Sequence, residues 1–361
     1  MKIQITLGVL VVFVSGVAFG MGIKRVEKIE LSQEKTFIQS AASIAVTEDN
    51  IIFLTDLKAG DIKIYDNTGT LLSVWGRKGA GPNEFLMPYY SDYKKGKLAM
   101  MDFGKRKIFI LERKKKFNLE ISKEMLCTGL GDDICLHGDR LLISGYKVDK
   151  QGETHNLYTQ NLNDGSVDFL LPIATKYGFK SYREFQNEDK RTRFYSTLSR
   201  VGYCDWQGEH VYYVWQGDLK IFKIDVQSKK TIYFGNKTSH YVQPFVTKNM
   251  ITARERRDRK TNTEVKSNMS IIIGLFVHND YLGVMYTRVS KSKDSKPGPM
   301  LQFYTLDGKF LDEVEMPGYP SSSSFFRKSD NTIFSVDIEG VDNENQDLDD
   351  KKYILKYEIT R

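Results

Sequence analysis

The stretch Ala41–Trp75, AASIAVTEDNIIFLTDLKAGDIKIYDNTGTLLSVW, decides the fold of this chain. Four short runs rich in β-branched and apolar residues are separated by polar connections that contain Asn, Asp and Gly. Runs of this length and composition are typical of strands joined by tight turns. The stretch therefore predicts a four-stranded antiparallel meander. Its expected strands are residues 41–46, 51–56, 61–66 and 70–75.

The same unit recurs along the chain. Five further copies are centred on residues 97–111, 134–159, 211–234, 271–305 and 333–359. The sixth copy lacks a fourth strand before Arg361, whereas the strand-like segment Arg25–Leu31 precedes the first copy without a partner. A closed ring explains both observations and removes the exposed sheet edges. We therefore predict an all-β fold, a six-bladed β-propeller of four-stranded antiparallel blades whose last blade is closed by the N-terminal strand.

One connection between blades carries a recognisable motif. The segment Trp75–Phe85, WGRKGAGPNEF, is followed by Pro88 and resembles the blade-connecting signature of NHL-type repeats. Glycines permit positive φ in a tight crossover, proline fixes the next turn, and Phe85 can enter the core between blades. The motif does not recur in later blades. The whole chain resembles bacterial exported six-bladed propellers of this type, which implies the fold and no particular activity.

Residues 1–22 are expected to be a targeting segment. Lys2 is followed by an apolar run over residues 3–22, and Ala18-Phe19-Gly20 places small residues as at a signal-peptide cleavage site. The alternative is an uncleaved membrane anchor, because the run approaches the length of a spanning helix. We expect the propeller to occupy residues 23–361 and to be exported, either periplasmic or extracellular, with any membrane attachment made through residues 3–22.

Composition excludes several classes of protein. With 40% hydrophobic and 12% aromatic residues, the chain can bury a large core and is not disordered. The net charge of +7 is a mild excess, and its basic clusters at residues 113–116 and 254–260 are expected to be solvated loops, so no nucleic-acid partner is expected. The chain's 3 cysteines cannot form a disulfide framework, although a bridge between Cys127 and Cys135 stays open.

Three aspartates occupy the same place in their blades, at the end of the second strand: Asp56, Asp102 and Asp337. In a ring these carboxylates could converge at one channel mouth on a polar ligand or on a hard cation such as calcium. The other interpretation, which we favour, is that they bond local backbone amides and fix the following turn. Trp215 and Tyr286 hold the corresponding place in two other blades and are expected to line the same funnel.

No other residues form a catalytic or metal-binding pattern. The five histidines are not at metal-ligand spacing, no Gly-x-Ser-x-Gly motif is present, and the run Ser321–Ser324 is interpreted as a polar loop. No cofactor is therefore expected, apart from the open possibility of calcium. Two charged insertions, at about residues 177–197 and 236–267, flank the fourth blade and are expected on one rim of the ring.

These observations favour a non-enzymatic exported propeller that binds a protein or glycan partner through one face of the ring. The alternative is a metal-dependent enzyme of the lactonase or lyase type, with a calcium-type ion at the channel mouth. A third hypothesis, attraction of the basic clusters to anionic surfaces, predicts binding that collapses with added salt.

Overall fold

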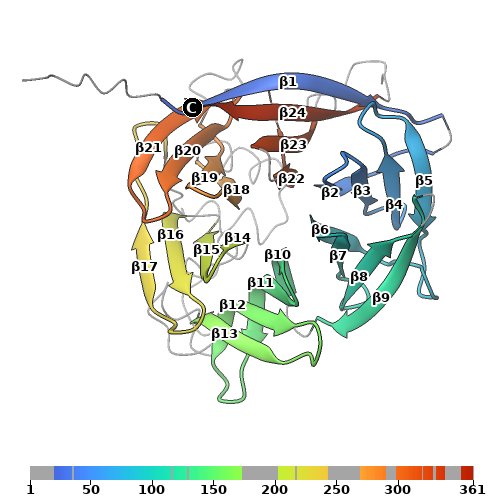
Figure 1. Cartoon of the computed structure of the whole chain (residues 1–361), viewed down its shortest axis with the longest axis horizontal. Helices are drawn as coiled ribbons and strands as arrows, with labels where there is room; N and C mark the ends of the chain where they lie inside the picture. The colour runs from blue at the N-terminus through green and yellow to red at the C-terminus, as the bar shows by residue number, and fades with distance from the viewer. Residues whose placement is uncertain are drawn as a thin grey trace, which may run out of the picture.

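The chain folds as a six-bladed β-propeller. The computed structural model describes residues 20–34, 36–114, 117–127, 130–172, 202–215, 218–242, 269–289, 298–318, 320–327, 331–337 and 351–360. These residues form six sheets of four antiparallel strands, arranged as a ring around a central axis (Figure 1). The predicted fold class is confirmed.

Successive blades follow one another around the ring, and in blades one to five the first strand of each blade lies innermost. The strands of the first three blades are β2(Ala41–Val46), β3(Ile52–Asp56), β4(Asp61–Tyr65) and β5(Leu71–Gly76); β6(Pro88–Lys94), β7(Lys97–Asp102), β8(Lys107–Arg113) and β9(Leu119–Leu126); β10(Leu130–His137), β11(Arg140–Val148), β12(Thr154–Asn161) and β13(Val167–Pro172). The next two blades comprise β14(Gly202–Gln207), β15(His210–Trp215), β16(Asp218–Asp225) and β17(Thr231–Phe234); β18(Ile272–Val277), β19(Tyr281–Tyr286), β20(Met300–Thr305) and β21(Phe310–Glu315).

The last blade closes the ring with strands from both ends of the chain. It comprises β22(Pro320–Arg327), β23(Thr332–Asp337), β24(Lys352–Thr360) and, as its outermost strand, β1(Gly22–Leu31). β1 pairs antiparallel with β24, from Gly22 opposite Thr360 to Leu31 opposite Lys352. The predicted closure by the N-terminal strand is therefore confirmed, although this strand begins three residues before Arg25.

The connection that carries the NHL-like motif is fixed by packing. Phe85 is fully buried, and its ring lies 5.4 Å from that of Trp75 and 5.2 Å from that of Phe109, so it joins the cores of blades one and two. Gly76 has φ 81°, and a Cβ atom there would lie 2.6 Å from the Phe85 ring. The motif therefore needs glycine at this position both for its backbone conformation and for the space that Phe85 fills.

Two predicted segments differ from the structure. Ser321–Ser324 was predicted as a loop, and this is wrong, because these residues lie within β22, the inner strand of the last blade. Ring geometry demands an inner strand there, and strand propensity is readily overridden by such context. The second and third strands of blade three are also longer than predicted, and their hairpin runs on to Val148 and restarts at Thr154.

The ring has two mouths, which the turns of the blades distinguish. We call the mouth where inner strands turn into second strands the hairpin mouth, and it carries turns such as 47–51 and 208–209. We call the opposite mouth the crossover mouth, because second strands end there and successive blades are joined there. The insertion predicted at 177–197 and most of that predicted at 236–267 lie outside the described residues, as do residues 1–19 of the predicted targeting segment.

Residues 236–242 belong to the described part of the second insertion and contact blade five. The Asn236 amide donates a hydrogen bond to the Tyr304 hydroxyl at 2.8 Å, and the Gln302 side chain donates to the Asn236 carbonyl at 2.9 Å. In the described part of the chain, no helix has the length and apolar character needed to cross a membrane.

Phe85→Ala should lower the free energy of unfolding by about 3–5 kcal/mol, because it removes a buried ring and leaves a cavity between two blades. Denaturant unfolding monitored by circular dichroism measures this change. Met87→Ala is the control in the same connection, since Met87 is 45% exposed and its truncation should cost about 0.5 kcal/mol or less. Equal losses for the two variants would contradict the role given to Phe85.

Candidate functional site

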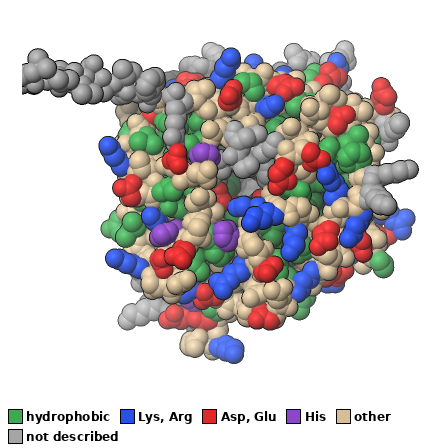
Figure 2. All heavy atoms as spheres, in the orientation of Figure 1, with side chains coloured by type: hydrophobic (Ala, Val, Ile, Leu, Met, Phe, Trp, Pro, Cys, Tyr) green, Lys and Arg blue, Asp and Glu red, His purple; other side chains and the backbone are tan. Residues whose placement is uncertain are grey.

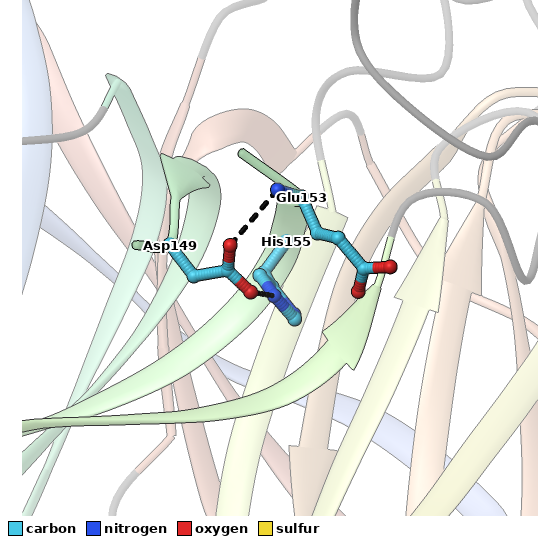
Figure 3. A group of neighbouring side chains, drawn as sticks. All are labelled: Asp149, Glu153 and His155. Atoms are coloured by element: carbon cyan, nitrogen blue, oxygen red, sulfur yellow. Dashed lines mark hydrogen bonds and ion pairs between the residues drawn. The ribbon is translucent and has the colours of Figure 1, made fainter. Parts of the chain in front are cut away.

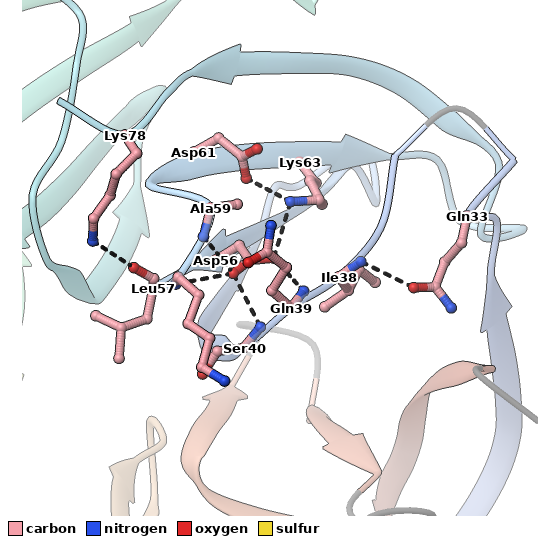
Figure 4. A network of polar contacts seen from close by, with 11 residues as sticks. Gln33, Ile38, Gln39, Ser40, Asp56, Leu57, Ala59, Asp61, Lys63 and Lys78 are labelled. Atoms are coloured by element: carbon pink, nitrogen blue, oxygen red, sulfur yellow. Dashed lines mark hydrogen bonds and ion pairs between the residues drawn. The ribbon is translucent and has the colours of Figure 1, made fainter. Parts of the chain in front are cut away.

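Asp56, at the end of β3, lies at the centre of a buried polar network (Figure 4). Its carboxylate accepts four backbone N–H groups, two from the residues before the inner strand and two from the following turn: Gln39, Ser40, Lys58 and Ala59, at 2.7–3.1 Å. It also bonds the Lys63 ammonium at 3.0 Å, and that fully buried ammonium bonds Asp61 at 2.6 Å. Asp56 thus ties the crossover to the turn of its own blade.

The positive charge of Lys63 is balanced by the carboxylates of this network. Burial alone would raise the pKa of Asp56, but hydrogen bonds from Ala59, Gln39 and Lys63 outweigh it and hold the pKa below its ordinary value. Burial raises the pKa of Asp61 despite its bond to Lys63. Lys63 therefore has at least one ionised partner at neutral pH, which a buried ammonium requires.

Asp102, at the end of β7, repeats the arrangement in blade two. It accepts the amides of Leu86, Met87 and Lys105 at 2.8–3.0 Å, so it also joins the crossover to the following turn. Asp337, at the end of β23, bonds the Lys28 ammonium of the closing strand at 2.8 Å. Each carboxylate is thus engaged within its own blade.

Trp215 and Tyr286 are both fully buried. The Trp215 ring packs against Tyr213 and Phe222 of the same blade, with ring centres 5.1 and 6.5 Å apart. The Tyr286 hydroxyl donates to Glu313 at 2.6 Å. Binding of a ligand by these five predicted residues stays a prediction, and the structure places each of them in contacts inside the fold.

A cavity of about 330 Å³ lies in the channel near the hairpin mouth. Its described walls come from the inner strands β2, β6, β10, β14 and β18, and they include none of the five predicted residues. Three aspartates on successive inner strands line it: Asp92, Asp133 and Asp205. These aspartates were not predicted, although an aspartate in each of three consecutive inner strands is a signal that the sequence contains.

These three aspartates link neighbouring blades. Asp92 accepts the Leu136 amide at 2.7 Å, Asp133 accepts the Cys204 amide at 3.0 Å, and Asp205 accepts the Val277 amide at 2.7 Å. Each carboxylate thus reaches from one inner strand to the next. An inner strand has an unpaired edge facing the channel, and these bonds satisfy some of its amides.

The cavity brings acidic side chains close together, and burial there favours their protonated forms. Burial raises the pKa of Asp92 to about 6 and that of Asp133 to about 8, and the mutual repulsion of the three carboxylates adds to both shifts. The side chains of these aspartates are half-buried, because they face the cavity. Lys94 is the one Lys or Arg among the described residues that line the cavity.

Two of the three cysteines lie in the cavity wall. Cys135 and Cys204 are buried free thiols, and burial raises the pKa of each well above its ordinary value, so neither is a ready thiolate nucleophile. The Cys135 thiol donates to Asp205 at 3.3 Å. Cys127 is also a free thiol, so the structure contains no Cys127–Cys135 bridge.

The hairpin between β11 and β12 carries a group that could hold a metal ion (Figure 3). The ligand atoms of Asp149, Glu153 and His155 all lie within 4.8 Å of one another. His155 Nε2 lies 2.8 Å from an Asp149 oxygen, and the His155 ring stacks 4.3 Å from Phe169. The hydrogen bond accounts for this geometry without an ion. The pattern Asp-x3-Glu-x-His is its sequence signal, and the spacing between histidines alone does not reveal it.

The face drawn in Figure 2 shows acidic and basic side chains interspersed among the described residues. A nucleic-acid-binding face would gather basic side chains on one surface, and the described residues of this face do not do so.

Comparison with known proteins agrees with this architecture. The model of a family described as DUF5128, 6-bladed beta-propeller, matches residues 23–269. A member of the DUF4221 family from Bacteroides vulgatus is 12% identical and superposes with a TM-score of 0.62, covering 95% of this chain and 99% of its own. A protein described as exported from Bacteroides fragilis is 11% identical, with a TM-score of 0.59 and coverage of 96% and 97%. At these identities the likeness shows the fold alone. No curated protein matches the chain.

Asp56→Asn should lower the free energy of unfolding by about 3–5 kcal/mol, because it leaves the buried Lys63 with a single partner that is itself hard to ionise. Thermal and denaturant unfolding measure the loss. Asp66→Asn is the matched control, since Asp66 accepts amides only within an exposed turn and should cost about 1 kcal/mol. A tolerated Asp56→Asn would contradict the structural role of this carboxylate.

The wild-type protein should lose stability between about pH 4 and pH 8 relative to Asp133→Asn. The folded-state pKa of Asp133, about 8, exceeds its ordinary value of 3.8, so the folded state binds the extra proton in that interval. The contribution of Asp133 is therefore complete below about pH 4 and is lost as the pH rises through about 8, by roughly 1–3 kcal/mol.

Denaturant midpoints across this pH range measure the difference. Asp139→Asn, at an exposed carboxylate of the neighbouring turn, serves as the control and should follow the wild-type profile. Parallel profiles for the wild type and Asp133→Asn would show that the carboxylate is not perturbed.

Proposed function

The chain belongs to the DUF5128 family of six-bladed β-propellers, and from this premise we propose that it acts as an exported, non-enzymatic binding module for a protein or glycan partner. In this proposal the partner sits on the hairpin mouth and inserts a side group into the channel cavity. The observation that carries the proposal is the cavity of about 330 Å³ enclosed by five inner strands. Concave sites with a few polar groups are the usual form of binding sites.

The rim of the cavity offers groups suited to recognition. Lys94 and Gln207 line it at the ends of β6 and β14, and Asn279 lines it from the turn after β18. Trp206 also belongs to the lining, and its ring stacks on that of His137 at 4.5 Å. The Gln207 amide lies 3.4 Å from the Asn279 side-chain oxygen. Hydrogen-bonding side chains held by a rigid ring can select a partner with little cost of ordering.

The engagement of Asp56 and Asp102 supports binding over catalysis. A calcium-type enzyme at the crossover mouth needs carboxylate oxygens that are available to the ion and its water. Asp56 accepts four amides and the Lys63 ammonium, and Asp102 accepts three amides. A cation there would have to displace these bonds, which also hold the blade together.

Export is part of the proposal and is supported by the N-terminal segment. Residues 3–22 have the apolar character of a signal peptide or an anchor. The Bacteroides fragilis protein of the same fold is described as exported. Export would present the ring and its channel mouth to partners outside the cytoplasm.

Asn279→Arg should abolish partner binding, because the new side chain can enter the acidic cavity and block it. The measurement is capture of envelope proteins and glycan-array binding by the immobilised protein. Gln151→Arg is the charge-matched control, because Gln151 is exposed on the β11–β12 turn at the crossover mouth. Loss with Gln151→Arg and retention with Asn279→Arg would place the partner on the other mouth and contradict the proposal.

A further inference from the structure

The walls of the channel cavity combine apolar surface with carboxylates. Val46, Ile134, Leu275 and Val277 belong to its lining, on the three inner strands β2, β10 and β18. The three aspartates that link the blades contribute the carboxylates: Asp92, Asp133 and Asp205. A ligand that fits such walls has an apolar stem and a positively charged end.

The described lining residues include more acidic than basic side chains. Glu48, Asp92, Asp133 and Asp205 are acidic, and Lys94 is the one Lys or Arg among the described lining residues. Carboxylates held together in a poorly solvated space repel one another and must be neutralised by protons or by a bound cation. Each carboxylate has lone pairs left beyond the amides that it accepts.

Resting on the proposed function, we propose that the partner inserts a primary alkylammonium group into this cavity, as the end of a lysine side chain of a protein. The four methylenes of lysine would contact the apolar walls, and the ammonium would reach the carboxylates. A compact ammonium with three donors can bond one or two carboxylates and water. A guanidinium binds best to two acceptor atoms that lie side by side in its plane. The three aspartates lie on separate strands, so we favour an ammonium.

A metal ion fits this cavity less well. Calcium takes six to eight oxygen ligands close to one another. Within the described residues, the group of three candidate metal ligands lies at the β11–β12 hairpin and not in the channel. An ammonium needs fewer fixed oxygen ligands than calcium does. It can therefore bind carboxylates that also accept amides of the neighbouring blade.

Titration calorimetry of the full propeller with n-pentylamine tests the proposal at pH 7, where the amine is protonated. Pentylammonium should bind, and 1-pentanol, its uncharged counterpart, should bind at least about tenfold more weakly. Asp92→Asn and Asp205→Asn should each weaken amine binding about tenfold while keeping a side-chain oxygen to accept the neighbouring amide. Asp139→Asn removes an exposed carboxylate on the same face and should leave binding unchanged.

Two further ligands test the source of the ammonium. Nα-acetyl-lysine amide should bind like pentylammonium, and glucosamine should not; the reverse order would overturn the assignment to lysine. Equal binding of pentanol, or unchanged binding in both aspartate variants, would overturn the ammonium site, provided that their thermal unfolding shows folded protein. If amines do not bind but Asn279→Arg still abolishes partner capture, the ammonium site is wrong and the proposed function stands. If amines do not bind and Asn279→Arg does not affect partner capture, both the ammonium site and the proposed function are wrong.

Discussion

The pairing of β1 with β24 is the interaction on which the ring depends. Each blade packs against two neighbours, so an open ring would leave two blades with an unpacked face and the last blade with an exposed edge. Backbone bonds from Gly22–Thr360 to Leu31–Lys352 join the first and last segments of the described chain. Lys28 of this strand also bonds Asp337, so the closing strand neutralises a buried carboxylate of the blade that it completes.

At both mouths of the ring, aspartate side chains accept hydrogen bonds from backbone N–H groups that have no partner in a sheet. At the crossover mouth, Asp56 and Asp102 collect amides of the crossover and of the following turn. At the hairpin mouth, Asp92, Asp133 and Asp205 each satisfy an amide of the next inner strand. Carboxylates are suited to both tasks because they accept several hydrogen bonds from N–H groups that have no partner in a sheet.

The repeat made the fold predictable, because the strands of 41–76 recur with turn residues at similar places. The inner strands were the part of each blade that was hardest to predict from the sequence. β14 was not recognised and Ser321–Ser324 of β22 was read as a loop, because inner strands are specified by the closure of the ring more than by β-propensity. The residues that line the cavity were even harder to predict from the sequence than the inner strands. Asp92, Asp133 and Asp205 are far apart in sequence, and only the ring brings them to one cavity.

The two sets of aspartates differ in what balances their charge. Asp56 has the Lys63 ammonium within 3.0 Å, and its pKa is lowered. Asp92 and Asp133 are bonded mainly by neutral amides, and their pKa values are raised. A structural carboxylate needs no further cation once an ammonium is beside it. The cavity carboxylates accept backbone amides of the next inner strand, and burial favours the protonated forms of Asp92 and Asp133, so their charge is balanced differently from that of Asp56.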